Sequence, residues 1–278
     1  MIPFTEFSKS GDVVHFAHAN GYPPECYKTF LNAFSENNKV IGMNARPLWP
    51  RESPQLLKNW KLFAKDLAVF FNEQNLKEII GIGHSMGGVS SLIAAAENPT
   101  LFSKLILIDP VIVHPQAYIM SRLPFFLSKR LVPMIKVAMR RRNEWESIEE
   151  ARLYFKSKKA FSRFQESSFN DFIDHGLKER DGKIVLAYPK EWEARVYSTL
   201  TSVWPILKKP PCPLVIIRGQ YSNVMNDPTW QLIKNVTLNA TFINMNKMGH
   251  MMPFERPFHL GQVIKPFIGP NHSHVSAT

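Results

Sequence analysis

Residues 83–87, GHSMG, contain a serine in the pattern G-x-S-x-G. The pattern follows a short apolar run and precedes a stretch of small residues at 86–99, so it lies where a predicted strand passes into a predicted helix. The serine of such a turn has a strained backbone, and glycines beside it leave room for the adjacent strand and helix. In isolation the pattern is equally compatible with an ordinary turn that uses small residues for packing. In this context it predicts that Ser85 presents a nucleophilic hydroxyl at the edge of a sheet.

The spacing excludes a nucleotide-binding loop at the same place. Gly81 and Gly83 match the first two glycines of G-x-G-x-x-G, but Met86 stands where the third is required. No lysine of a phosphate-binding loop follows. The segment is therefore typical of nucleophilic chemistry rather than of nucleotide binding.

His250 is the histidine best placed to activate this serine. A serine hydroxyl is a weak nucleophile at neutral pH, so a histidine must take its proton during attack and return it to the leaving group. Of the nine histidines, only His250 directly follows the last predicted strand, at 240–246, and precedes the last predicted helix, which Pro257 opens. Loops at this end of a parallel sheet form its functional edge. We therefore expect His250 to be the general base.

Two backbone amides are expected to stabilise a developing oxyanion. One belongs to Met86, at the start of the helix behind Ser85. The other belongs to Tyr22 in HANGYPP, residues 18–24, where Gly21 allows a tight turn that leaves the Tyr22 amide free to point into the site. The same segment is also compatible with a plain turn built of Asn, Gly and Pro.

The elements that must position these residues alternate along the chain. Ser53 and Pro54 predict a helix running to about residue 74, because serine can cap free amides and proline suits the first helical position. Alternation of strands and helices favours a mostly parallel sheet flanked by helices, since parallel neighbours need a crossover between them. The strands are predicted at 12–18, 39–44, 78–85, 104–110, 213–219 and 240–246.

The alternation breaks in the middle of the chain. Residues 114–205 are rich in helix formers, aromatic residues, Lys and Arg, and they contain no clear strand pattern. The predicted organisation is an α/β core of residues 1–113 and 206–270, a helical cap inserted at 114–205, and a flexible tail at 271–278.

The order of these segments resembles the α/β-hydrolase superfamily and, within it, the capped serine esterases. HANGYPP, GHSMGG, LIDP, RGQYSNV and MGHMMPFERP carry the resemblance, and they span nearly the whole chain. It implies a nucleophile elbow at Ser85, His250 as the base, and the amides of Tyr22 and Met86 as the oxyanion hole. Epoxide hydrolases and haloalkane dehalogenases of similar shape use an aspartate nucleophile, so Ser85 argues against both.

The acid of a catalytic triad is harder to assign. Family members often carry it after the strand that corresponds to 213–219, but that loop holds Asn223 near the expected place, and an amide lacks the charge that steadies an imidazolium. A minority carry it after the preceding strand, where this chain has Asp109. We therefore expect Asp109 to be the acid. Asp227 is a second candidate if its loop folds back. The Asp109-Pro110 pair is also compatible with an ordinary turn at the end of a strand.

The composition restricts the partners. The chain has a formal net charge of +11 and a pI of about 9.6, and such a positive surface attracts anions. The sequence contains no nucleic-acid-binding motif. The basic clusters at 140–142 and 156–159 are therefore expected to form a solvated face. Residues 123–142 mix apolar and basic side chains, which is compatible with a cap helix over a pocket or with weak contact to a membrane surface. The sequence makes no prediction of oligomeric state.

The remaining features predict a cytoplasmic protein without a metal or cofactor. Cys26 and Cys212 are too few for a disulfide framework or a metal site of their own. The first residues lack the pattern of a signal peptide, and no segment reaches the apolar length that spans a bilayer.

Together these observations predict a serine hydrolase that cleaves carboxylic esters of small to medium acyl chains through an acyl-enzyme intermediate. The alternatives are another Ser-His-Asp acyl or C–C bond hydrolase, an acyltransferase, or a catalytically silent binding protein of the same fold. The insert is expected to cover Ser85 and to set substrate choice, because ligand pockets are mostly apolar and the insert contains Phe125, Phe126, Leu127 and Trp145.

Overall fold

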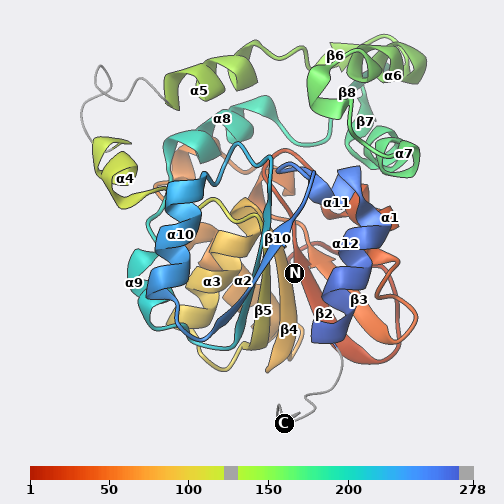
Figure 1. The fold of residues 1–278 in the computed structure, drawn as a ribbon. Coiled ribbons are helices and arrows are strands. Elements are labelled where there is room, and N and C mark those ends of the chain that lie inside the picture. The colour runs from red at the N-terminus through yellow and green to blue at the C-terminus, as the bar shows by residue number, and fades with distance from the viewer. Residues whose placement is uncertain (122–130, 269–278) are drawn as a thin grey trace.

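The computed structural model describes residues 1–121 and 131–268, so the predicted tail at 271–278 lies outside the described residues (Figure 1). A seven-stranded sheet runs through the centre in the order β1-β3-β2-β4-β5-β9-β10, and every neighbouring pair is parallel except β1 and β3. The predicted α/β fold with a mostly parallel sheet is therefore confirmed. The strands are β1 (Phe4–Glu6), β2 (Asp12–Ala17), β3 (Asn38–Met43), β4 (Ile79–His84), β5 (Phe102–Ile108), β9 (Leu214–Gly219) and β10 (Ala240–Met245).

Alternate residues of the central strands pack on opposite faces of the sheet. On β5, Leu105 and Leu107 belong to one apolar cluster, whereas Ile106 and Ile108 belong to the other. Successive side chains of a strand point to opposite faces, so a continuous apolar run is what a sheet covered by helices on both sides requires. The helices of the first face are α2 (Lys61–Glu73), α3 (Met86–Glu97), α9 (Trp204–Lys208) and α10 (Asp227–Val236), and those of the second are α1 (Lys28–Leu31), α11 (Met252–Glu255) and α12 (Pro257–Ile264).

The predicted start of the helix after Ser53 is wrong. Ser53 precedes only a short 3-10 turn, Pro54–Leu56, and its side chain makes no capping hydrogen bond. Helix α2 begins later, after Trp60, whose amide donates to Thr201 Oγ1 at 2.8 Å. The partner that satisfies the start of this helix is 141 residues away in the chain, so the local Ser-Pro signal did not indicate it.

The insert at 114–205 is not purely helical, in contrast to the prediction. It contains a small antiparallel sheet in the order β6-β8-β7, built from β6 (Glu144–Trp145), β7 (Leu177–Arg180) and β8 (Lys183–Leu186). Strands this short show no clear alternation, but Asp181 and Gly182, with φ of 54° and 75°, form the Asp-Gly turn typical of a tight hairpin. The insert's helices are α4 (Pro115–Ser121), α5 (Leu131–Arg140), α6 (Ile148–Lys156), α7 (Glu166–His175) and α8 (Lys190–Ser198).

The insert covers the end of the sheet that carries the loop after β2. Figure 1 shows α5, α6, α7 and α8 as a layer over that end of the core. Tyr22, in the loop after β2, packs against Phe164 and Phe172 of the insert, with ring centroids 6.5 and 5.7 Å apart. Among residues 1–121 and 131–268, no helix combines the length and apolar character needed to cross a bilayer.

Two buried histidines link β2 to the region of β3. His15 Nε2 accepts the amide of Met43 at 3.3 Å, and His18 Nε2 accepts the amide of Ala45 at 3.0 Å. Burial lowers the pKa of His15 to about 3, and burial also lowers the pKa of His18. Both rings are therefore neutral acceptors in the folded protein at neutral pH.

We expect the free energy of unfolding to fall as the pH is lowered from 7 toward 4. The pKa of His15 in the folded protein lies below its ordinary value of 6.5, so the unfolded chain takes up the proton first; the contribution is complete above about pH 6.5 and is lost as the pH falls toward about 3. One such group removes about 2 kcal/mol between pH 6.5 and 5. Urea unfolding followed by circular dichroism should show a shallower pH dependence for His15→Leu. An unchanged dependence would show that His15 does not contribute.

Candidate active site

Ser85 occupies a sharp turn between β4 and α3. Its backbone has φ 57° and ψ −117°, a conformation that L-residues rarely adopt, and its amide donates to the carbonyl of Ile108 at 2.9 Å. A Cβ on Gly87 would lie 2.1 Å from the carbonyl oxygen of Ala17, and one on Gly83 would lie 2.5 Å from Gly88 Cα. The glycines on both sides are therefore required for the close approach of strand and helix.

His250 connects Ser85 to Asp109. Its Nε2 lies 3.0 Å from Ser85 Oγ, and its Nδ1 lies 2.6 Å from Asp109 Oδ2. A carboxylate only accepts hydrogen bonds, so Nδ1 carries the proton and Nε2 is left as the acceptor that faces the serine hydroxyl. This is the tautomer that can take the serine proton.

Asp109 follows β5 and is completely buried. It adopts φ 42°, and its amide donates to the carbonyl of Ile217 on β9 at 2.7 Å. Besides His250, two donors hold the carboxylate, namely Ser222 Oγ on Oδ2 at 2.6 Å and the Gly219 amide on Oδ1 at 3.3 Å. A buried carboxylate needs such partners, and these fix both of its oxygens.

The loop after β9 supplies a hydroxyl rather than a carboxylate. Asp227 pairs with Arg218 at 2.6 Å, and its side chain is 83% exposed, so the structure does not bring it to His250. Asn223 is exposed as well. Ser222, which the sequence analysis missed, donates to Asp109 and accepts the amides of Val224 and Met225, both at 3.1 Å. Nothing local marks this serine, because its partner is 113 residues away.

The two predicted oxyanion donors differ in their surroundings. Met86 is the first residue of α3, and amides of a first helical turn have no partner within the helix. The Tyr22 amide was expected to be free, but it donates to the carbonyl of Ala19 across a turn at 3.4 Å. A bond of that length is weak, so an incoming oxyanion can compete for this amide.

Helix α8 of the insert meets the loop after β2. The Asn20 side chain donates to the main-chain carbonyl of Glu193 at 3.1 Å, and a Cβ on Gly21 would lie 3.8 Å from the Glu193 carboxyl carbon. The Glu193 side chain is 5% exposed, and its carboxylate pairs with Arg141 at 2.9 Å. Burial raises the pKa of Glu193, and Arg141 opposes that shift. An ion pair of the insert therefore lies beside the predicted oxyanion loop.

The apolar residues expected over Ser85 are only partly located. Phe125, Phe126 and Leu127 lie outside the described residues. Trp145 is completely buried against Tyr154 and Phe155, both of the insert, so it belongs to the core of the insert. Isolated aromatic residues did not distinguish a pocket lining from a packed interior.

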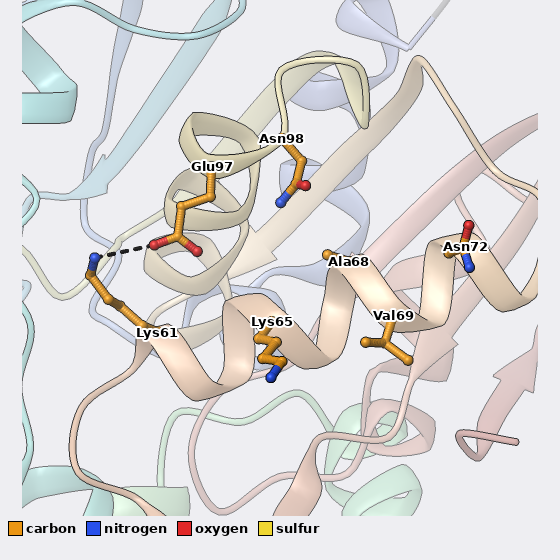
Figure 2. A pocket seen from close by; sticks show the side chains of 7 residues that line it. All are labelled: Lys61, Lys65, Ala68, Val69, Asn72, Glu97 and Asn98. Carbon is orange, nitrogen blue, oxygen red and sulfur yellow. Dashed lines mark ion pairs between the residues drawn. The ribbon is translucent and has the colours of Figure 1, made fainter.

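A separate hollow lies on the surface formed by α2 and α3 (Figure 2). It measures about 480 Å³ and is lined in part by Lys61, Glu97 and Asn98, with Lys61 and Glu97 paired at 3.2 Å. Glu97 ends α3 whereas Ser85 precedes it, and a rise of 1.5 Å per residue places the two ends roughly 18 Å apart. The hollow is therefore not part of the Ser85 site. Within residues 1–121 and 131–268, no group of three His, Cys, Asp or Glu side chains is arranged to hold a metal.

Fold and site define an α/β protein of the hydrolase type, with a serine on a strand-to-helix turn in contact with a histidine and a buried aspartate. The model of the alpha/beta hydrolase family matches residues 16–260, and the chain belongs to that family. This confirms the resemblance drawn from the sequence motifs.

Individual relatives are distant. The chain is 23% identical to "Uncharacterized hydrolase YugF" of Bacillus subtilis, over 96% of this chain and 98% of that protein. It is 25% identical to "Putative esterase/lipase" of Haemophilus influenzae, over 86% of this chain and 77% of that protein. Among solved structures it is similar to E-2-(acetamidomethylene)succinate hydrolase, with a TM-score of 0.79 and 17% identity over 95% and 94% of the two chains. At that identity the solved structure shows the shared fold alone.

Proposed function

We propose that this protein is a serine hydrolase that cleaves carboxylic esters of small to medium acyl chains. Ser85 is the nucleophile, His250 the base and Asp109 the acid, while the amides of Met86 and Tyr22 receive the oxyanion. The observation that carries the proposal is the continuous set of contacts from Ser85 Oγ through His250 to Asp109, with distances of 3.0 and 2.6 Å. The esterase/lipase name of the Haemophilus influenzae relative supports ester chemistry.

The reaction proceeds in two halves. Ser85 Oγ attacks the ester carbonyl carbon while His250 Nε2 takes the hydroxyl proton, and the carbonyl oxygen becomes an oxyanion. When the tetrahedral intermediate collapses, the bond to the alcohol oxygen breaks, and His250 gives that oxygen the proton. Water then attacks the acyl-enzyme with His250 again as the base, which releases the carboxylic acid and restores Ser85.

A substrate screen tests the reaction class. p-Nitrophenyl esters of increasing acyl length, run beside amide and lactone substrates, should show turnover of the esters with a maximum at small to medium acyl chains. Turnover of amides, of lactones or of a carbon–carbon bond without ester hydrolysis would instead favour another acyl or C–C bond hydrolase. Transfer of the acyl group to an added alcohol in preference to water would indicate an acyltransferase.

A fluorophosphonate probe separates an enzyme from a silent binding protein. Such probes react with serines that a neighbouring base activates. Labelling of folded protein at Ser85 is expected. Folded protein that is never labelled would support a binding protein of hydrolase fold.

We also place the protein in the cytoplasm, as its sequence predicts, and cell fractionation tests that location.

The insert is proposed to set substrate choice through its ion pair. Glu193→Gln removes the negative charge beside Gly21 and leaves Arg141 without its partner at 2.9 Å. We expect kcat/KM for esters with a carboxylate on the acyl group to rise about tenfold relative to neutral esters, which corresponds to one charge interaction of about 1.4 kcal/mol. Kinetics on a succinate half-ester and a butyrate ester of one alcohol provide the measurement.

The matched control is Glu191→Gln on the same helix, where the side chain is exposed. This variant should leave the ratio between the two esters unchanged. Equal ratios in Glu193→Gln and the wild-type protein would show that the ion pair takes no part in substrate choice.

A further inference from the structure

His84 is a buried histidine next to the nucleophile that takes no part in the proposed triad. It ends β4, is completely buried, and has its ring centroid 5.0 Å from that of His250. Its Nε2 lies 2.9 Å from the main-chain oxygen of His250, and its Nδ1 lies 2.8 Å from the hydroxyl of Tyr27. The Tyr27 oxygen in turn accepts the amide of Ala19 at 3.3 Å.

The direction of each hydrogen bond follows from the acceptors. The main-chain oxygen of His250 only accepts, so His84 Nε2 carries a proton and donates to it. Burial holds the pKa of His84 well below its ordinary value, so the ring is neutral and Nδ1 is an acceptor. The Tyr27 hydroxyl therefore donates to Nδ1, and its oxygen is left to accept from Ala19. One tautomer of His84, with the proton on Nε2, therefore satisfies every group in this series of hydrogen bonds.

This series of hydrogen bonds, from Ala19 through Tyr27 and His84 to His250, joins three parts of the site. Ala19 lies in the segment that carries the Tyr22 amide, His84 precedes Ser85, and His250 bears the base. On the other side of His250, the Glu255 carboxylate accepts the amide of Gly249 at 2.9 Å and is itself held by Arg163 at 2.9 Å. His84 thus fixes the carbonyl of His250, while Glu255 fixes the amide of the residue before it, Gly249.

We propose that His84 and Tyr27 are positioning residues that hold the main chain of His250 in register with Ser85 and with the loop after β2. This inference rests on the proposed function, because it assigns the two side chains a task in that reaction. The base must keep its 3.0 Å contact with Ser85 Oγ during attack, and displacement of a reacting group by about 1 Å can cost about a hundredfold in rate. Neither side chain contacts the reacting atoms, so their effect is exerted through His250.

The test uses the full chain and two variants at position 84. His84→Leu removes both hydrogen bonds, and we expect kcat for p-nitrophenyl butyrate to fall about 10- to 100-fold, with KM changed less than about threefold. The rate of fluorophosphonate labelling at Ser85 should fall in the same proportion. His84→Gln retains one donor and one acceptor, and it should restore kcat to within about fivefold of the wild-type value.

Two further variants separate positioning from a structural role. His15→Leu removes another fully buried imidazole, whose partner is the Met43 amide; it should leave kcat and the labelling rate within about twofold of the wild-type values. Tyr27→Phe removes only the hydroxyl and keeps His84, and should lower kcat about 3- to 10-fold. If His84→Leu fails to fold, Tyr27→Phe decides the question.

The outcomes that overturn the proposal are distinct from failure of the proposed function. A folded His84→Leu or Tyr27→Phe protein with wild-type kcat and labelling rate would show that the two residues do not position His250. Equal losses in His84→Leu and His15→Leu would show a purely structural role. If the wild-type protein neither hydrolyses esters nor reacts with the probe, the proposed function itself is wrong, and this inference falls with it.

Discussion

Ser85→Ala is expected to lower turnover of a p-nitrophenyl ester by about 10⁴- to 10⁶-fold while the protein keeps its fold. The substitution removes the atom that attacks the carbonyl carbon, and no other group replaces it. The Ser85 side chain does not cap α3, so its loss removes the contact with His250 without exposing the end of the helix. Substrate binding should survive. Ester hydrolysis per mole of purified protein, together with circular dichroism, provides the measurement.

Ser91→Ala is the matched control for this substitution. Ser91 lies on α3, the helix that Ser85 precedes; it is completely buried, and its hydroxyl has no hydrogen-bond partner within residues 1–121 and 131–268. This variant should keep turnover near the wild-type value. If Ser85→Ala kept more than a few per cent of wild-type hydrolysis, Ser85 would not be the nucleophile.

Asp109→Asn is expected to lower kcat by about 10³- to 10⁴-fold. The carboxylate accepts a hydrogen bond from the N–H of His250 Nδ1 at 2.6 Å, and this bond leaves Nε2 free to accept the proton of Ser85. An amide at position 109 can present its NH₂ group to His250, which favours the opposite tautomer, and it lacks the charge that stabilises the imidazolium. The Gly219 amide can still donate to the remaining carbonyl oxygen, and the Ser222 hydroxyl can accept from the NH₂ group that replaces its partner oxygen, so the fold should be largely retained.

Two variants of the loop after β9 provide the controls. Asp227→Asn weakens an ion pair whose carboxylate is 83% exposed, and Asn223→Ala changes an exposed amide. Each should change kcat by less than about threefold, because exposed positions seldom contribute much. A loss of several orders of magnitude in Asp227→Asn, with Asp109→Asn near wild type, would assign the acid to Asp227.

The choice between these carboxylates shows where sequence reasoning reached its limit. The G-x-S-x-G turn and the histidine after the last strand are local patterns, and both residues lie where the parallel sheet was expected to bring them. Asp109 was favoured over Asn223 because only a carboxylate carries the required charge. Its distance from His250, however, depends on β5 being the neighbour of both β4 and β9. Strand order is a property of the folded sheet, and the pattern of a single sequence does not specify it.

By itself, the sequence determined the α/β class, the approximate strand positions and the segments that contain Ser85 and His250. These depend on apolar runs and glycine turns, which act over a few residues. Only the tertiary structure decided that Ser222 holds Asp109, that Glu193 lies against Gly21, and that Tyr27 and His84 connect to His250. Such partners are separated by many residues, for example 57 between Tyr27 and His84 and 113 between Asp109 and Ser222. Their hydrogen bonds form because packing excludes water and leaves a buried polar group only the protein partners that the fold brings to it, which no local pattern encodes.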